Sequence, residues 1–344
     1  ITLPTIALQM YGGEDGWRWA IAQSAIVMAA YGVYYWFAIT DGPVGTVHRK
    51  PRKAVALEVS SWGDMIKPIL WTLPLVGVLG LLVWRIENMG YLSATGAAIC
   101  YAVIVAIVCY QIIQILRVNI PLLKQGVPED DKYPFNSVAA LNSTYFANFG
   151  AELAVVSMLP MFFEETWSLS ATAAGLIAAS FAFVNLVARP MGGLVSDRMG
   201  NRRFVMLSYM FGISVGFALM GLMNSSWPLI IAVGITVFTS FFVQGAEGAT
   251  FGIIPSIKRR LTGQISGMAG AYGNVGAVVY LTIFTFVTPS QFFYIIAGGA
   301  FVSWLLCMMW LKEPESGFSE EYHVSSVDLQ IEEEERRRQA VATG

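Results

Sequence analysis

Charge, histidine and cysteine are all scarce in this chain of 344 residues. Only 13% of the residues are charged, against about 25% in soluble domains, and the mean hydropathy is +0.59. His48 and His323 lie outside the long apolar stretches, which argues against a haem or a zinc site within them. Cys100, Cys109 and Cys307 lie inside those stretches, where we expect apolar packing rather than disulfides or metal ligation. No cofactor or metal is predicted, and basic residues in short scattered clusters argue against nucleic acid as a partner.

Apolar runs of roughly 20 residues recur along almost the whole chain, and each is long enough to cross a hydrocarbon layer of about 30 Å. They predict an all-α membrane protein embedded in the lipid bilayer. The expected spans are Trp17–Ile39, Ile66–Trp84, Tyr91–Leu116, Ser137–Phe163, Ser170–Pro190, Phe204–Met223, Leu229–Phe251, Gln264–Val287 and Gln291–Leu311.

Lysine and arginine gather in every second connection between these spans. Cytoplasmic loops of membrane proteins carry that excess, so the basic loops and the C-terminal tail are expected in the cytoplasm. The pattern predicts an integral multi-pass protein of the bacterial inner or plasma membrane. The basic loops are Arg49–Lys53, Arg117–Lys132, Arg198–Arg203 and Lys258–Arg260.

The segments between the spans give three weaker expectations. Ala54–Met65 is polar enough for an interfacial helix, and Arg117–Asn136 is typical of a solvated connector. The two flank a hairpin, Ile66–Leu116, that leaves and returns to the cytoplasm. Glu332–Arg338 places glutamates before arginines at i,i+4 spacing, which is typical of a solvated helix.

Arg189 is the most informative single residue, because it ends the apolar run Ser170–Ala188 before a basic, glycine-rich loop. A cation inside a membrane span costs several kcal/mol unless it faces a polar cavity or a partner. We therefore expect Arg189 to serve an anion rather than packing.

Two other spans carry polar stripes with a carboxylate. Asn142, Tyr145, Phe149 and Glu152 recur at intervals of 3, 4 and 3 residues, which places them on one helical face. Hydrogen-bonded helix packing would also explain such a face, but Glu152 favours a water-filled cavity. Ser240, Gln244 and Glu247 form a similar face in a later span.

Glycines form a third pattern, in the span Gln264–Val287. Gly263, Gly267, Gly270 and Asn274 fall within about 60° of one helical face, with Gly273 and Gly276 further round. Tight helix packing and contact with a ligand both remain open for these glycines. Because no strand precedes them, the spacing does not indicate a nucleotide site.

Several of these residues carry a family resemblance. The segment from Gly193 to Arg203 resembles the G-x-x-x-D-R-x-G-x-R-R loop of the major facilitator superfamily, a conformational loop of that fold. The matching residues are Gly193, Asp197, Arg198, Gly200, Arg202 and Arg203.

A more specific resemblance lies further along the chain. Gly245–Pro255, followed by Gly267–Ala277, is similar to the second nitrate signature of the nitrate/nitrite porter family and its preceding helix. Tyr145–Leu153 and Ala188–Gly193 resemble two further spans of the same family. The resemblance implies a secondary transporter that moves nitrate and nitrite by alternating access.

Residue by residue, the resemblance implies that Arg189 holds the anion and that Tyr145 and Phe149 shape its pocket. It also places three residues of the signature beside the anion: Gly270, Gly273 and Asn274. The chemistry agrees, because a guanidinium offers planar, forked donors to a planar anion and never deprotonates. Glu152 and Glu247 are candidates for proton coupling, or for holding helices together.

The resemblance also implies a domain plan. Residues 1–53 would end an N-terminal half that is mostly missing, 54–136 would be an inserted hairpin, 137–312 a complete six-helix C-terminal half, and 313–344 a tail. On this plan half of the anion site lies outside the chain. We therefore expect the chain, without the missing N-terminal half, neither to transport nor to bind nitrate.

Three rival functions remain open from the sequence. A porter for another small anion and a nitrate sensor that does not translocate both fit the spans. A membrane enzyme fits poorly, because the spans lack a nucleophile–base pair or a metal cluster.

Overall fold

The computed structural model describes residues 16–39 and 56–313, together with parts of 326–337. Every regular element in these residues is helical, and eight helical stretches are long and apolar enough to cross a membrane. This confirms the predicted all-α membrane class. The elements are α2 (Gly16–Ala38), α3 (Trp62–Asn88), α4 (Ala94–Gln125), η1 (Glu129–Asp131), α5 (Phe135–Trp167), α6 (Ala171–Phe183), α7 (Asn185–Arg198), α8 (Arg202–Leu222), α9 (Leu229–Ile257), η2 (Arg259–Leu261), α10 (Thr262–Phe284) and α11 (Pro289–Trp310).

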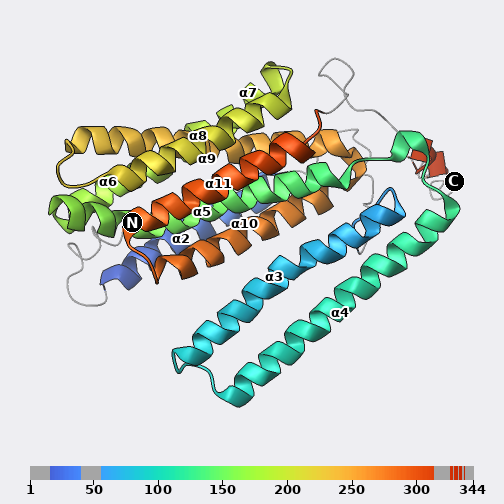
Figure 1. Ribbon diagram of the computed structural model, residues 1–344, viewed down its shortest axis with the longest axis horizontal. Coiled ribbons are helices and arrows are strands. Elements are labelled where there is room, and N and C mark those ends of the chain that lie inside the picture. Colours follow the sequence, from blue (N-terminus) through green and yellow to red (C-terminus); the bar gives the residue numbers. More distant parts are fainter. Residues whose placement is uncertain are drawn as a thin grey trace.

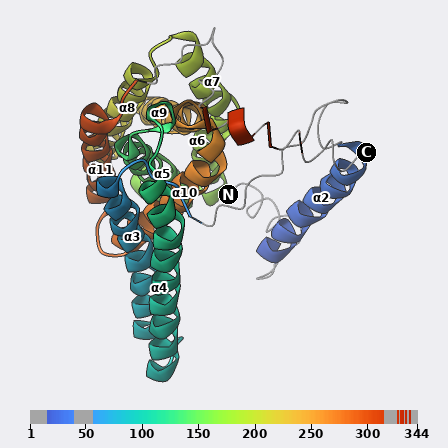
Figure 2. The same ribbon diagram turned by 90° about the vertical axis from the view of Figure 1, so that its right-hand side faces the viewer.

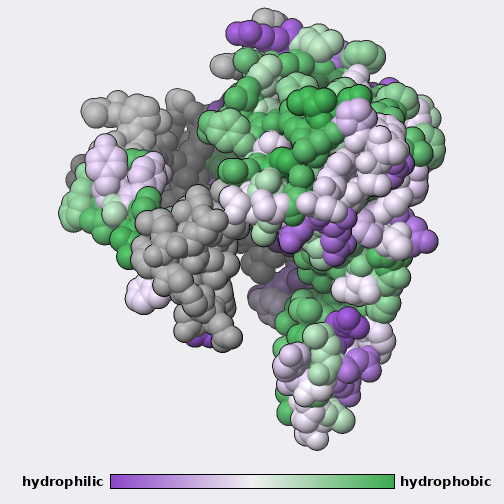
Figure 3. Space-filling view, turned by 90° about the vertical axis from the view of Figure 1, so that its left-hand side faces the viewer, coloured by the Kyte–Doolittle hydropathy of each residue, from purple (hydrophilic) through white to green (hydrophobic). Residues whose placement is uncertain are grey.

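Helices α5 to α11 form a bundle in which α5 runs through the middle (Figure 1). Helix α5 packs against α10, α9, α11 and α6, while α7 pairs with α9 and α8 with α11. Its central position is reflected in burial, since most residues from Phe135 to Val155 in this helix are buried. Apolar residues cover a large part of the face of the bundle seen in Figure 3. Large apolar side chains such as Phe183, Leu186 and Ile230 are exposed, as expected of a surface that faces lipid.

Helix α2 lies apart from this bundle (Figure 2). Its large apolar side chains are exposed, with Trp36 at 81% and Phe37 at 82%. Residues 1–15 and the basic loop Arg49–Lys53 lie outside the described residues, as does most of 314–344. In the described part of the tail, Arg337 pairs with Glu333 at 2.7 Å, and both side chains are exposed, as predicted for a solvated helix.

The span predicted at Ser170–Pro190 differs from its expectation in two ways. It is interrupted at Val184, which separates α6 from α7. It also continues past Arg189, so that the predicted loop is helical as far as Arg198. The helix ends where Gly200 adopts a positive φ of 65°, a conformation that glycine reaches without strain.

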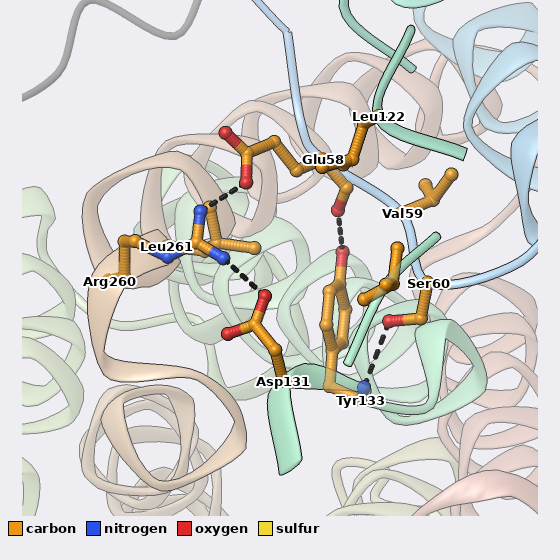
Figure 4. A pocket seen from close by; sticks show the side chains of 9 residues that line it. Glu58, Val59, Ser60, Leu122, Asp131, Tyr133, Arg260 and Leu261 are labelled. Carbon is orange, nitrogen blue, oxygen red and sulfur yellow. Dashed lines mark hydrogen bonds and ion pairs between the residues drawn. The ribbon is translucent and has the colours of Figure 1, made fainter. Parts of the chain in front are cut away.

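The hairpin α3–α4 lies beside α10 through α3 (Figure 1). The end of the hairpin that is predicted to be cytoplasmic is joined to the bundle by a cluster of charged side chains. The guanidinium of Arg260 lies between the carboxylates of Glu58 and Asp131, 2.8 Å from the latter (Figure 4). Lys258 also pairs with Asp131. The hydroxyl of Tyr133 donates to the carbonyl of Glu58 at 2.5 Å, which fixes the two connectors to each other.

The first connector prediction was wrong, and the second holds only in part. The described residues of 54–65 before Trp62 are not helical, because Val59 donates its backbone N–H to the buried Asn119 side chain at 2.7 Å. In the segment 117–136, residues 128–130 are exposed as predicted, but the first residues extend α4 and both Asn119 and Asp131 are buried. A charge such as Asp131 is buried here because oppositely charged groups meet it.

Candidate anion site

Helices α7 and α9 cross with their backbones in direct contact. A Cβ atom added to Gly248 would collide with the carbonyl oxygen of Arg189, and one added to Gly192 would collide with the carbonyl of Gly245. Small residues at such a crossing let membrane helices approach this closely. The crossing brings Arg189 on α7 next to Glu247 on α9.

Arg189 forms ion pairs with two carboxylates. Its guanidinium pairs with Glu247, whose side chain is fully buried, and lies 3.5 Å from Glu152 on α5. The Arg189 side chain keeps 36% of its surface exposed, while its Nε atom is buried and has no hydrogen-bond partner among the described residues. Two carboxylates against one guanidinium leave the group with an excess negative charge when both are ionised. Helices α5, α7 and α9 thus bring Glu152, Arg189 and Glu247 together.

The aromatic residues of the α5 stripe lie against this ion cluster. Tyr145 and Phe149 stack with ring centroids 5.0 Å apart and an interplanar angle of 9°. The Arg189 guanidinium carbon lies 5.9 Å from the Phe149 ring centroid, which is cation–π range. Phe251 of α9 meets Tyr145 edge-on at 5.0 Å. The structure therefore joins Arg189, Tyr145, Phe149, Glu152 and Glu247 in a single group.

Of the three signature residues on α10, Gly273 lies against the aromatic pair, whereas the described contact between Gly270 and Asn274 lies within α10. A Cβ atom on Gly273 would lie 2.6 Å from the Tyr145 ring and 2.7 Å from the Phe149 ring, so this glycine gives the aromatic pair its space. Gly270 has nothing within 4 Å of an added Cβ atom. Asn274 is exposed, and its amide donates to the carbonyl of Gly270 at 2.9 Å. The described hydrogen bond of Asn274 therefore stays within α10.

Two amide side chains complete the group around Glu152. Asn185 donates to one carboxylate oxygen at 2.9 Å, and the Gln244 amide lies 3.4 Å from the same oxygen. Gln244 stands out in the sequence as part of a polar face, but Asn185 was missed. Its signal is a lone asparagine in an apolar run, one helical turn before Arg189.

The conformational loop residues gather at the junction of α7 and α8. Arg202 pairs with Asp197 at 3.3 Å, and the Glu313 carboxylate accepts the backbone N–H groups of Arg202 and Arg203 at 2.9 and 2.7 Å. A carboxylate at a helix N-terminus satisfies otherwise unpaired donors.

Within the residues described, no group of three or more histidine, cysteine, aspartate or glutamate side chains suits a metal ion.

Comparison with known proteins bears on this arrangement. The nitrate/nitrite transporters NrtP of Picosynechococcus sp. and Nostoc punctiforme are 42% and 40% identical over 91% and 93% of this chain. The chain spans 62% and 65% of their lengths, a little under two thirds. The high-affinity nitrate transporter 2.3 of Oryza sativa subsp. japonica is 41% identical over 41% of this chain and 28% of its own length.

These matches confirm the resemblance drawn from the motifs. The sequence model of the Major Facilitator Superfamily matches residues 141–340, which include helices α6 to α11 and all but the first turns of α5. That match covers more than half of the chain and coincides with the bundle that holds Arg189. The chain belongs to the Major Facilitator Superfamily.

Proposed function

We propose that this chain belongs to a secondary transporter that moves nitrate and nitrite across the cell membrane by alternating access, and that it is not an enzyme. The observation that carries the proposal is the partly exposed Arg189 side chain, whose guanidinium lies beside the Phe149 ring inside an apolar bundle. Relatives named as nitrate transporters support the substrate class.

The geometry suits a flat, singly charged anion. A forked guanidinium donates two hydrogen bonds in one plane, and the Phe149 ring, supported by the stacked Tyr145 ring, offers a flat apolar surface beside it. A small organic anion of another shape would use this surface less well. Uptake of labelled nitrate with competing anions tests the proposal: nitrite should compete, whereas tetrahedral sulfate and non-planar lactate should not. Equal competition by lactate would favour the rival porter for another anion.

The two carboxylates suggest how the anion gains access to Arg189. Without a bound anion, Glu247 and Glu152 neutralise the guanidinium, so an incoming anion must compete with them. Protonation of either carboxylate would weaken its hold on Arg189 and strengthen anion binding. We propose that this competition couples nitrate entry to proton uptake.

Replacing a glutamate by glutamine tests the coupling, because the amide keeps size and hydrogen bonding but cannot titrate. Glu152→Gln or Glu247→Gln is expected to flatten the pH dependence of nitrate uptake, with the larger effect at the residue that carries the proton. The measurement is initial uptake rate against external pH in cells that carry the complete native gene. If both variants keep the wild-type pH profile, coupling lies elsewhere or the transport is anion exchange.

We also propose the topology that follows from the basic loops. The turn between α3 and α4 would be external, the connectors 54–61 and 126–134 cytoplasmic together with the C-terminal tail, and the hairpin an insertion between two transporter halves. The contacts of the connectors with Lys258 and Arg260 support this plan. These two residues belong to the basic loop Lys258–Arg260, which is expected to be cytoplasmic.

A single cysteine at Asn88 in a background without other cysteines tests the topology. Asn88 is exposed at the end of α3, so its cysteine variant is expected to react with an impermeant thiol reagent on intact cells. The matched control is Lys124→Cys, at the exposed opposite end of the hairpin, which should react only after permeabilisation. The reverse pattern of labelling would overturn the topology.

A further inference from the structure

The helix that carries Arg189 is interrupted five residues before it, at Val184. In a continuous helix the carbonyl of Phe181 would accept the backbone N–H of Asn185. Instead it accepts two side-chain hydrogen bonds from α9, from the Ser240 hydroxyl at 2.6 Å and the Gln244 amide at 2.9 Å. A backbone carbonyl released within the hydrocarbon region needs such partners. Hydrogen bonds from α9 therefore stabilise the interruption at Val184.

Gln244 connects this interruption to the anion site. The amide nitrogen that binds the Phe181 carbonyl also lies 3.4 Å from the Glu152 carboxylate. Asn185, the first residue after the interruption, donates to the same carboxylate oxygen at 2.9 Å. The other oxygen of Glu152 faces Arg189 at 3.5 Å. Both sides of the interruption thus reach Arg189 through one carboxylate.

The buried position of these groups makes their hydrogen bonds costly to lose. Ser240 and Gln244 are fully buried, and Glu152 is 7% exposed. A buried donor or acceptor that loses its partner costs more than an exposed one, because water cannot replace the bond. The direction of Arg189 therefore depends on α9 as well as on its own helix.

We propose that Gln244, assisted by Ser240, is a positioning residue for anion transport: it holds the interruption at Val184 and the Glu152 carboxylate together, and so sets where Arg189 presents its guanidinium. The inference rests on the proposed transport of nitrate. It assigns Gln244 no contact with the anion.

Kinetics of nitrate uptake by cells carrying the complete native gene test this role. Gln244→Met keeps the length of the side chain and removes its donors, and Ser240→Ala removes the second bond. We expect Gln244→Met to raise the KM for nitrate about tenfold, with a smaller change in maximal rate per membrane-embedded protein, because misplaced Arg189 weakens binding. Thr236→Val is the matched control: Thr236 is equally buried on α9, but it bonds only to the carbonyl of Ala232 in its own helix. Its KM should stay at the wild-type value.

A double-mutant cycle separates positioning from general packing. If Gln244 acts through the Glu152 carboxylate, the KM effect of Gln244→Met should shrink in a Glu152→Gln background. Additive effects would overturn the proposal, as would a wild-type KM in Gln244→Met. Loss of both Gln244→Met and Ser240→Ala from the membrane, with Thr236→Val intact, would also overturn it by making the two residues structural. Absence of saturable nitrate uptake by the wild type would instead refute the proposed function.

Discussion

Replacing Arg189 by lysine is expected to remove most nitrate transport while the protein still inserts into the membrane. Lysine keeps the positive charge that Glu247 and Glu152 require, so the ion cluster survives. It loses the planar fork and the flat surface that faces Phe149. Hydrogen bonds to charged groups contribute about 1.5–3 kcal/mol, so nitrate affinity should fall about 10- to 100-fold. Initial uptake rates per membrane-embedded protein measure the effect.

Arg85→Lys is the matched control for that variant. Arg85 also lies over a phenylalanine, with its guanidinium carbon 5.5 Å from the Phe286 ring, but it belongs to the hairpin. Its uptake should match the wild type. Undiminished uptake by Arg189→Lys would refute the assignment of Arg189 to the anion, and disappearance of that variant from the membrane would show that Arg189 is structural.

The variant Gly248→Ala, which adds a single methyl group, should lower nitrate transport about as much as Arg189→Lys does. The new Cβ atom would collide with the carbonyl oxygen of Arg189 and lie 3.1 Å from the backbone nitrogen of Gly193. Backbone atoms cannot turn aside as a side chain can, so α7 must move away from α9. Overpacking of this kind costs about 1–3 kcal/mol. Because Arg189 and Glu247 face each other across this crossing, transport should fall by about tenfold or more.

Gly252→Ala provides the comparison, one helical turn further along α9. Its added Cβ atom would lie 3.6 Å from Gly193, which is ordinary contact. Alanine also favours a helix by about 1 kcal/mol over glycine, so this variant should keep both transport and thermal stability. Equal losses of transport and stability in the two variants would show that the close crossing is not what places Arg189.

The sequence predicts the spans well because their existence depends on local composition. Each long helix of the bundle coincides with an apolar run except α7, whose second half lies in the predicted loop. The stripe of Tyr145, Phe149 and Glu152 shares one face as its spacing predicts, and it meets Arg189 as the family resemblance implies. Glu247 was selected for its charge inside an apolar run. Its ion pair with Arg189 depends on the crossing of α7 and α9, which helical periodicity does not reveal.

Three features lay beyond the sequence for physical reasons. The interruption at Val184 is stabilised by Ser240 and Gln244, more than fifty residues away in the chain, and no glycine or proline marks it locally. Asp131 is typical of a solvated loop until Lys258 and Arg260 approach it. Gly273 proves to be a packing position, whereas Gly270 faces open space, although both share one motif. In each case long-range contacts decide the role of a residue.

Counterflow in proteoliposomes tests the central claim most directly. Vesicles that hold the protein from its complete native gene are loaded with unlabelled nitrate and diluted into labelled nitrate, without any ion gradient. Alternating access through a site at Arg189 predicts transient accumulation of label by the wild type, its inhibition by external nitrite, and its near absence in Arg189→Lys. Specific binding of nitrate without accumulation would identify a sensor, and equal accumulation by Arg189→Lys would place the anion site elsewhere; either result would contradict the account.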